Sequence, residues 1–332
     1  MCDYESVIEE YRASRPSGPF WSCSYIESGM AFNVNTVTAC CVTQHGQAWP
    51  FLADFDGGTP PIPTILRSKR RMTALNQDKS YPQCANCTRL TRQEWPPQEH
   101  LFDRLLFAHF RHCNIACRYC SIASRTADTR PPYRLLPALE HLFRHGLMAH
   151  RGQIHWGGGE PTVLREFEDV MAFLADYSHQ HIIYTNCVIH SPRIEELLTR
   201  RSATLTCSVD SGSREVYLAI KQRDYSDRVW ANIRRYAATG GDIVTKMLVL
   251  PENYHDVLAF AERSPQGRIR PGLQHDIGSR GCEQCGCFSR EGRPGSRTGS
   301  AGRHLCHPNA PRNQRTATPG RTDKGRPRGL IQ

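Results

Sequence analysis

Three cysteines, Cys113, Cys117 and Cys120, stand close together in the chain, with gaps of three and two residues between them. Thiolates are the ligands that iron and other soft metals prefer, and an eight-residue loop lets three sulfurs converge on one cluster. A four-iron cube held by three protein thiolates keeps one iron open for chemistry. The triplet therefore predicts an iron–sulfur site with an open coordination position. Taken alone, it is also compatible with a zinc loop.

A glycine-rich turn at residues 157–161 follows about one strand and one helix later. Gly158 and Gly159 carry no side chain where a ligand's amino group would approach the backbone. Glu160 can accept a hydrogen bond from that ammonium, and Pro161 stiffens the turn. The cysteine triplet, the aromatic Tyr119 before its last member, and this Gly-Gly-Glu-Pro turn together resemble the radical S-adenosylmethionine (radical SAM) family.

The resemblance implies a 4Fe-4S cluster whose open iron is chelated by the amino and carboxylate groups of S-adenosylmethionine (SAM). An electron from a donor such as flavodoxin or ferredoxin then cleaves SAM, and the resulting 5′-deoxyadenosyl radical abstracts hydrogen from a substrate. In this family Tyr119 would lie over the adenine edge, and Asn186, Ser208 and Asp210 would fall where the ribose and the methionine carboxylate are held. For the last three, helix caps or turn residues are the alternative. No catalytic residue beyond the cluster ligands is assigned.

Strands and helices are expected to alternate between residues 101 and 263. Hydrophobic periodicity predicts strands near 105–110, 153–156, 181–184, 203–209 and 243–250, with helices near 135–147, 167–177, 194–198, 229–238 and 257–261. This order indicates an α/β fold with a parallel sheet, and the resemblance makes it a partial (β/α)6 radical SAM barrel. Every motif follows a strand, which places the site at the C-terminal mouth of the barrel.

Residues 1–100 contain a second set of cysteines, Cys23, the pair Cys40-Cys41, and Cys84 with Cys87. Their layout resembles the SPASM or twitch module, which usually follows the barrel and holds auxiliary 4Fe-4S clusters. The resemblance implies one auxiliary cluster here, with Cys23, Cys41, Cys84 and Cys87 as ligands and Cys40 as the alternative to Cys41. A structural zinc site with four sulfurs is the other interpretation. SPASM relatives suggest a peptide or protein substrate, and a small molecule stays open.

The segment 264–332 carries most of the net charge of +10, with thirteen Lys and Arg against four Asp and Glu. It is rich in Gly, Pro and Ser and has no apolar periodicity, which predicts a disordered basic tail. No sixth barrel strand is recognisable after the helix near 257–261. We therefore interpret the tail as a frameshifted or replaced terminus that leaves five strands of six.

Composition narrows the class of protein further. The chain has no apolar run of the length a membrane span needs, and the start of the chain is acidic rather than signal-like, which predicts a cytoplasmic protein. Its fifteen cysteines then favour metal thiolates over disulfides.

Two other classes compete with the active enzyme: an inactive or truncated radical SAM homologue, and a non-catalytic protein that binds zinc or nucleic acid. Phe288 is the only aromatic residue of the tail, so stacking on bases is not expected.

Overall fold

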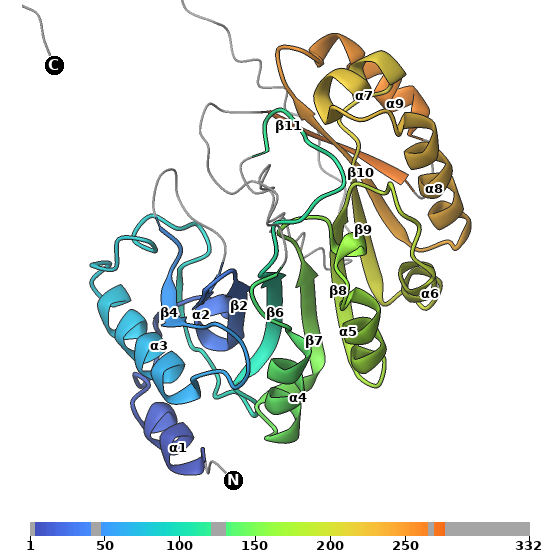
Figure 1. Cartoon of the computed structure of the whole chain (residues 1–332). Coiled ribbons are helices and arrows are strands. Elements are labelled where there is room, and N and C mark those ends of the chain that lie inside the picture. The colour runs from blue at the N-terminus through green and yellow to red at the C-terminus, as the bar shows by residue number, and fades with distance from the viewer. Residues whose placement is uncertain (1–3, 41–47, 121–130, 265–268, 276–332) are drawn as a thin grey trace, which may run out of the picture. The chain divides into compact units, whose positions relative to one another are not determined.

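A nine-stranded sheet organises the fold in the computed structural model, which describes residues 4–40, 48–120, 131–264 and, for the backbone alone, 269–275 (Figure 1). Across this sheet the order is β11 (Ile269–His275), β10 (Asp242–Val249), β9 (Ala203–Ser208), β8 (Ser178–Thr185), β7 (Met148–Trp156), β6 (Phe102–Ala108), β2 (Gly29–Asn33), β3 (Thr36–Thr38) and β4 (Phe51–Asp54). A small second sheet pairs β1 (Phe20–Ser22) with β5 (Thr91–Gln93).

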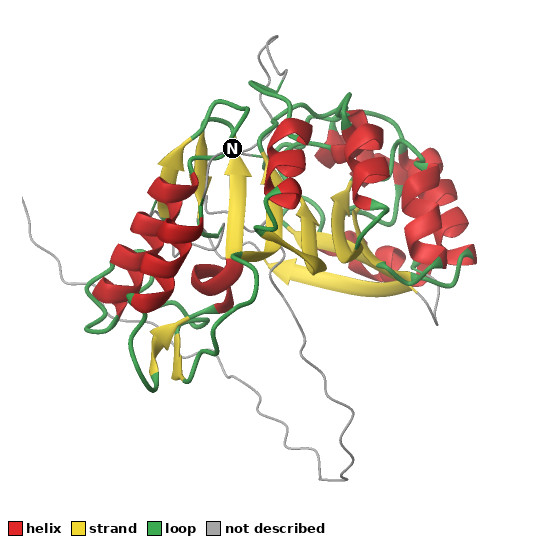
Figure 2. Cartoon of the chain, turned by 90° about the horizontal axis from the view of Figure 1, so that it is seen from below, coloured by secondary structure: helices red, strands yellow, loops and turns green. Residues whose placement is uncertain are grey.

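Strands β6 to β11 are consecutive, parallel neighbours joined by helices. The helices are α4 (Leu136–Arg144), α5 (Phe167–Leu174), α6 (Pro192–Thr199), α7 (Arg214–Lys221), α8 (Ser226–Ala238) and α9 (Val257–Arg263). Local sequence explains their starts: at α6, for example, the Ser191 hydroxyl accepts from the Ile194 backbone N–H, and Pro192 occupies the first turn. Figure 2 shows these helices (red) outside the strands (yellow). The predicted parallel α/β sheet is therefore confirmed.

The prediction that the sixth barrel strand is missing was wrong. β11 pairs in parallel with β10 over seven residues, from Ile243 opposite Ile269 to Val249 opposite His275. Pro271 and Gly272 lie inside β11 and hide its strand signal, because both residues are rare in strand interiors. Proline is tolerated there because β11 is an edge strand of this sheet. The remainder of the expected tail, residues 276–332, lies outside the described residues.

The N-terminal region shares the main sheet instead of standing apart from it. β2 pairs in parallel with β6, and β3 and β4 then extend the sheet antiparallel. The sequence-based boundary near residue 100 therefore does not coincide with a break in the sheet. β2 and β3 form an antiparallel hairpin, and the region also contains helices that were not predicted. They are α1 (Glu5–Ala13), α2 (Ser24–Ser28) and α3 (Ile62–Asn76).

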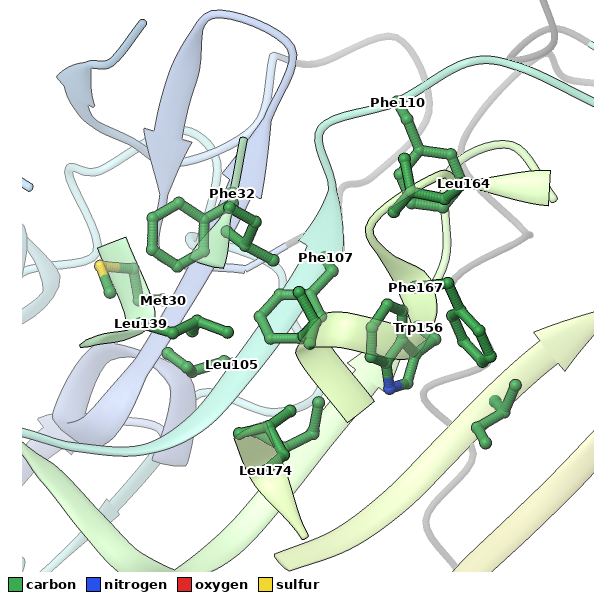
Figure 3. Close-up of a cluster of buried hydrophobic side chains, with 14 of the residues drawn as sticks. Met30, Phe32, Leu105, Phe107, Phe110, Leu139, Trp156, Leu164, Phe167 and Leu174 are labelled. Carbon is green, nitrogen blue, oxygen red and sulfur yellow. The ribbon is translucent and has the colours of Figure 1, made fainter. Parts of the chain in front are cut away.

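One apolar core runs from β2 through β6 to β7 (Figure 3). The ring centroids of Phe32 on β2 and Phe107 on β6 are 6.4 Å apart, and those of Phe107 and Trp156 on β7 are 4.9 Å apart. Leu139 of α4 and Phe167 of α5 are buried in the same core. The N-terminal strands and the parallel strands are thus packed as one body. Within the described part of the chain, no helix is both long enough and apolar enough to cross a membrane.

Candidate active site

The predicted site residues gather at the carboxyl edge of the parallel strands. The loop with Cys113, Cys117 and Cys120 follows β6, and the Gly-Gly-Glu-Pro turn follows β7. Asn186 follows β8, and Ser208 is the last residue of β9, where it is half-buried. Because the carboxyl ends of parallel strands share one edge, the fold brings these motifs together. The three thiols are half-buried and form no disulfide.

Backbone pairing between the two motifs continues beyond the end of β6. The N–H of Gly159 donates to the carbonyl oxygen of Phe110 at 3.0 Å, and that of Glu160 to His112 at 2.8 Å. His112 is the residue directly before Cys113. The glycine-rich turn therefore fixes the start of the cysteine loop.

Two glycines of the turn are required by this close approach. A Cβ at residue 159 would lie 2.0 Å from the carbonyl oxygen of His112. A Cβ at residue 158 would lie 2.7 Å from that of Phe110, and Gly158 also has a φ of +83°. By contrast, a Cβ at Gly157 would come no closer than 3.9 Å to the oxygen of Phe107. Gly158 and Gly159 thus have a structural reason that is separate from their predicted role at a ligand.

Glu160 is buried and is held by protein donors. Its carboxylate accepts hydrogen bonds from the hydroxyls of Thr162 and Thr185, each at 2.7 Å, and from the backbone N–H of Asn186 at 2.7 Å. Burial raises the pKa of Glu160, and these hydrogen bonds act in the opposite direction. The side chain ties the short 3-10 helix that starts at Pro161 to the end of β8. Its predicted contact with a ligand ammonium stays a prediction.

Asn186 reaches the cysteine loop directly. Its Nδ2 donates to Oδ1 of Asn114 at 2.6 Å and lies 3.6 Å from Sγ of Cys113. Its Oδ1 accepts from the backbone N–H of Val188 at 3.0 Å. The structure therefore uses the side chain of Asn186 to hold the loop, a role that the sequence did not indicate.

Asp210 and Tyr119 meet at a lysine that sequence analysis missed. Nζ of Lys221 lies 2.5 Å from Oδ2 of Asp210, and the Tyr119 hydroxyl donates to the same oxygen. The backbone N–H of Leu248 donates to Oδ1 at 2.7 Å. Burial acts to raise the pKa of Asp210, but the charge and hydrogen bond of Lys221 outweigh it and hold this pKa below its usual value. The pair is buried, ionised and joined to the aromatic residue of the cysteine motif.

The C-terminal end of α7 supports the same loop. The N–H of Ala116 donates to the carbonyl oxygen of Lys221 at 3.1 Å, and that of Arg118 to Ile220 at 3.0 Å. Carbonyl groups in the last turn of a helix have no partner within the helix and are free to accept such bonds. The apolar spacing of Val216, Tyr217 and Ile220 is a sequence signal that could have predicted α7.

The donor set fits an iron–sulfur cluster. Burial raises the pKa of the Cys113 thiol to about 12 and raises that of Cys117, although Lys221 acts to lower the latter. Cluster ligation therefore displaces protons from these thiols. Among the described residues, no group of three His, Cys, Asp or Glu side chains converges as a single metal ion requires. Three soft thiolates from one short loop are a donor set that suits a four-iron cube with one open iron.

The N-terminal cysteines are also brought together. Cys23, Cys40, Cys84 and Cys87 line one pocket, so three of the four predicted auxiliary ligands are neighbours. Cys41, the predicted fourth ligand, lies outside the described residues, and Cys40 lines the pocket beside the other three.

Residues 107–263 match the family model of the Radical SAM superfamily. The matched segment contains both motifs and the parallel strands β7 to β10. Just under half of the chain is therefore a radical SAM superfamily segment, as the motifs predicted.

The curated relatives are matched over part of their length. The chain is 24% identical to molybdenum cofactor biosynthesis protein moc-5 of Caenorhabditis elegans, over 49% of this chain and 28% of that protein. It is 27% identical to GTP 3′,8-cyclase 1 of Mycobacterium tuberculosis, over 44% of this chain and 43% of the relative. The chain therefore spans less than half the length of either relative. Among solved structures, Streptococcus suis SuiB gives a TM-score of 0.44 at 15% identity, over 67% of this chain and 47% of SuiB.

Proposed function

We propose that the protein is a radical SAM enzyme whose 4Fe-4S cluster is held by Cys113, Cys117 and Cys120. The observation that carries the proposal is a three-thiol loop fixed at the carboxyl edge of a parallel sheet, in a segment that matches the family. When bound, the cluster supplies the electron that cleaves SAM to methionine and a 5′-deoxyadenosyl radical, which abstracts hydrogen from a substrate.

The residues around the loop divide into two proposed roles. Backbone carbonyl oxygens of the turn at residues 157–161 and the half-buried Ser208 are the proposed contacts to SAM, since they lie at strand ends beside the loop. Asn186, Asp210 and Tyr119 are positioning residues, because protein groups already occupy their polar atoms. Within the ionised pair, Lys221 favours the thiolate of Cys117 and Asp210 opposes it, so the pair is proposed to act on the loop through its contact with Tyr119.

The substrate is proposed at the level of class. The layout of the N-terminal cysteines suggests a peptide or protein, and the name of the mycobacterial relative adds GTP as a small-molecule candidate. Hydrogen abstraction is common to all of these. A set of deuterated candidate substrates separates them, because only the true substrate transfers deuterium to 5′-deoxyadenosine.

The test is anaerobic reconstitution with iron and sulfide, followed by dithionite and SAM, with 5′-deoxyadenosine measured by chromatography. The parent protein is expected to form the product. The Cys113→Ala, Cys117→Ala, Cys120→Ala variant is expected to form none. An iron-loaded, folded parent that makes no 5′-deoxyadenosine would identify an inactive homologue. A parent that takes up zinc in place of iron would identify the non-catalytic class.

A further inference from the structure

The N-terminal pocket has the composition of a second metal site. We propose that Cys23, Cys40, Cys84 and Cys87 hold an iron–sulfur cluster with four protein thiolates, and that the buried ammonium of Lys69 balances its negative charge. This inference goes beyond the proposed function, because it concerns other residues and does not require SAM cleavage.

The four cysteines come from three separate segments that the fold brings to one pocket. Cys23 lies between β1 and α2, Cys40 follows β3, and Cys84 and Cys87 lie in the turns after α3. Apolar side chains that include Ile26, Met72 and Leu90 complete the pocket wall. Such a convergence of distant thiols in an apolar setting is a recurrent feature of cluster sites.

The backbone at each of these segments is fixed by hydrogen bonds. The N–H of Cys84 donates to Tyr81 at 3.0 Å, and the N–H of Cys87 donates to Cys84 at 2.9 Å, so two successive turns present both thiols. The hydroxyl of Thr38 donates to the carbonyl oxygen of Cys40 at 3.0 Å. The carbonyl oxygen of Cys23 accepts from the N–H of Glu27 at 2.9 Å in the first turn of α2. The pocket is therefore preorganised.

All four cysteines of the pocket are free thiols. They are therefore available as ligands, and binding of iron displaces their protons.

The buried side chain of Lys69 is a second observation in favour of an anionic metal cluster, and it does not depend on the cysteines. Its side chain is 1% exposed, and its Nζ has no hydrogen-bond partner among the described residues. It lies 5.1 Å from the centroid of the Phe102 ring. A buried ammonium without an anionic partner costs several kcal/mol. The fold therefore carries a positive charge that needs a nearby anion.

Two carboxylates, Glu27 and Asp103, favour the ammonium of Lys69, but its Nζ forms no hydrogen bond with either of them. Both are engaged by arginines: Glu27 pairs with Arg15 at 2.5 Å, and Asp103 pairs with Arg104 at 3.1 Å. Cys23 follows Glu27 among the groups whose negative charge would favour the ammonium. Lys69 also lies one helical turn before Met72, which lines the pocket. A cluster with four thiolates is anionic and would supply the missing charge.

The number of thiols separates this site from the loop at Cys113. Four thiolates occupy the outer position of every iron in a cube, whereas three leave one iron open. Zinc also accepts four thiolates, so the metal content measured below separates the two metals. The proposed cluster of the pocket has closed coordination, whereas that of the loop is open.

The experiment uses the full chain in the Cys113→Ala, Cys117→Ala, Cys120→Ala background, which removes the first site. After anaerobic reconstitution with ⁵⁷Fe, we expect about four irons per chain and the Mössbauer spectrum of a 4Fe-4S cluster. Adding Cys40→Ser is expected to remove this spectrum, whereas the matched control Cys41→Ser is expected to keep it. Retention in Cys40→Ser with loss in Cys41→Ser would overturn the ligand assignment.

Measurements on the parent keep the test decisive if a variant fails to fold. The parent is expected to bind about eight irons, as two 4Fe-4S clusters. About four irons in the parent, or one zinc per chain in the triple variant, would overturn the proposal. Loss of SAM cleavage alone would leave it standing, so failure of the two proposals is distinguishable.

The role of Lys69 is tested by the redox behaviour of this cluster. Lys69→Met removes a buried positive charge from α3, the helix whose Met72 lines the pocket. This makes reduction of the cluster harder, so we expect a lower midpoint potential in the triple-variant background. Lys79→Met is the control, because Lys79 is exposed and lies over Trp21. An unchanged potential in Lys69→Met would overturn the charge-balancing role.

Discussion

The two cysteine sets of this protein are built in opposite ways. The loop at Cys113 takes three thiols from eight consecutive residues, and the surrounding strand ends only have to hold the loop in place. The N-terminal pocket takes four thiols from segments up to 64 residues apart in the chain, and the fold itself assembles the site. A local motif can be found from sequence, whereas an assembled site needs the structure to select its ligands.

The two sites also differ in whether their buried lysine, Lys221 or Lys69, is paired with a carboxylate. Lys221 has its own carboxylate, Asp210, and the pair is complete without metal. Lys69 has no such partner among the described residues, and Glu27 nearby is paired with Arg15. The loop is therefore expected to keep its supports in the apo protein, and the pocket is expected to gain stability when its cluster binds.

Gly159→Ala is expected to have the largest effect on the supports of the loop. The Cβ of the new alanine would lie 2.0 Å from the carbonyl oxygen of His112, so either the glycine-rich turn or the start of the cysteine loop must move. We expect a loss of about 4 kcal/mol or more in the free energy of unfolding and loss of iron at the loop. Gly157→Ala is the matched control, since its Cβ has 3.9 Å of clearance. Urea unfolding of both variants, with iron analysis, makes the comparison. Equal behaviour of the two would show that close approach does not explain the glycines.

Lys221→Met and Lys69→Met are expected to change apo stability in opposite directions. The first leaves Asp210 as an unpaired buried charge and should cost about 3–5 kcal/mol. The second removes an unpaired buried charge and should stabilise the apo protein by about 1–3 kcal/mol. Denaturant unfolding of the metal-free protein measures both.

A double variant separates charge from packing at Lys221. Lys221→Met combined with Asp210→Asn should recover part of the loss, because no unpaired charge remains. If both lysine variants destabilise the apo protein equally, the contrast between the two sites is wrong.

Acid is expected to weaken the strands that carry the loop. Burial lowers the pKa of His155 on β7 to about 4 and that of His181 on β8 to about 3. Both imidazoles are neutral in the folded state, so their contribution is complete above the unfolded value of about 6.5 and is lost as pH falls from there toward 4. Each contributes a slope of up to about 1.4 kcal/mol per pH unit. Unfolding of the apo protein between pH 7 and 4.5 measures this slope. A slope that is unchanged in His155→Gln, His181→Gln would assign the acid sensitivity to other groups.

Asn186→Ala is expected to have the smallest effect of the series. It removes the hydrogen bond of 2.6 Å to Asn114 and the contact with Cys113, which predicts a loss of about 1–2 kcal/mol. The iron content of the pocket should not change, and the cluster of the loop should be lost more rapidly in air. Electron paramagnetic resonance (EPR) after timed exposure to oxygen checks this. Equal rates in the variant and the parent would contradict a supporting role of Asn186.

The sequence predicted what is local and missed what depends on tertiary contact. The cysteine loop and the strand that precedes each motif follow from short patterns, and the structure confirms them. Lys221 acts on Tyr119, 102 residues away, and no spacing in the sequence signals that pairing. β11 was missed because Pro271 and Gly272 obscure a strand that its position at the sheet edge permits.

The choice between Cys40 and Cys41 shows the same limit at its smallest scale. The pattern of residues does not select one of the two. The fold places Cys40 in the wall of the pocket with Cys84 and Cys87, whereas Cys41 lies outside the described residues.

The contrast between an open and a closed cluster is tested most directly by EPR of the reduced, reconstituted protein with and without SAM. The account predicts two cluster signals, of which SAM changes only one. The signal that changes on addition of SAM should disappear in the Cys113→Ala, Cys117→Ala, Cys120→Ala variant. The remaining signal should not change when SAM is added. A SAM response that persists in that variant, or no response in the parent, would contradict the account.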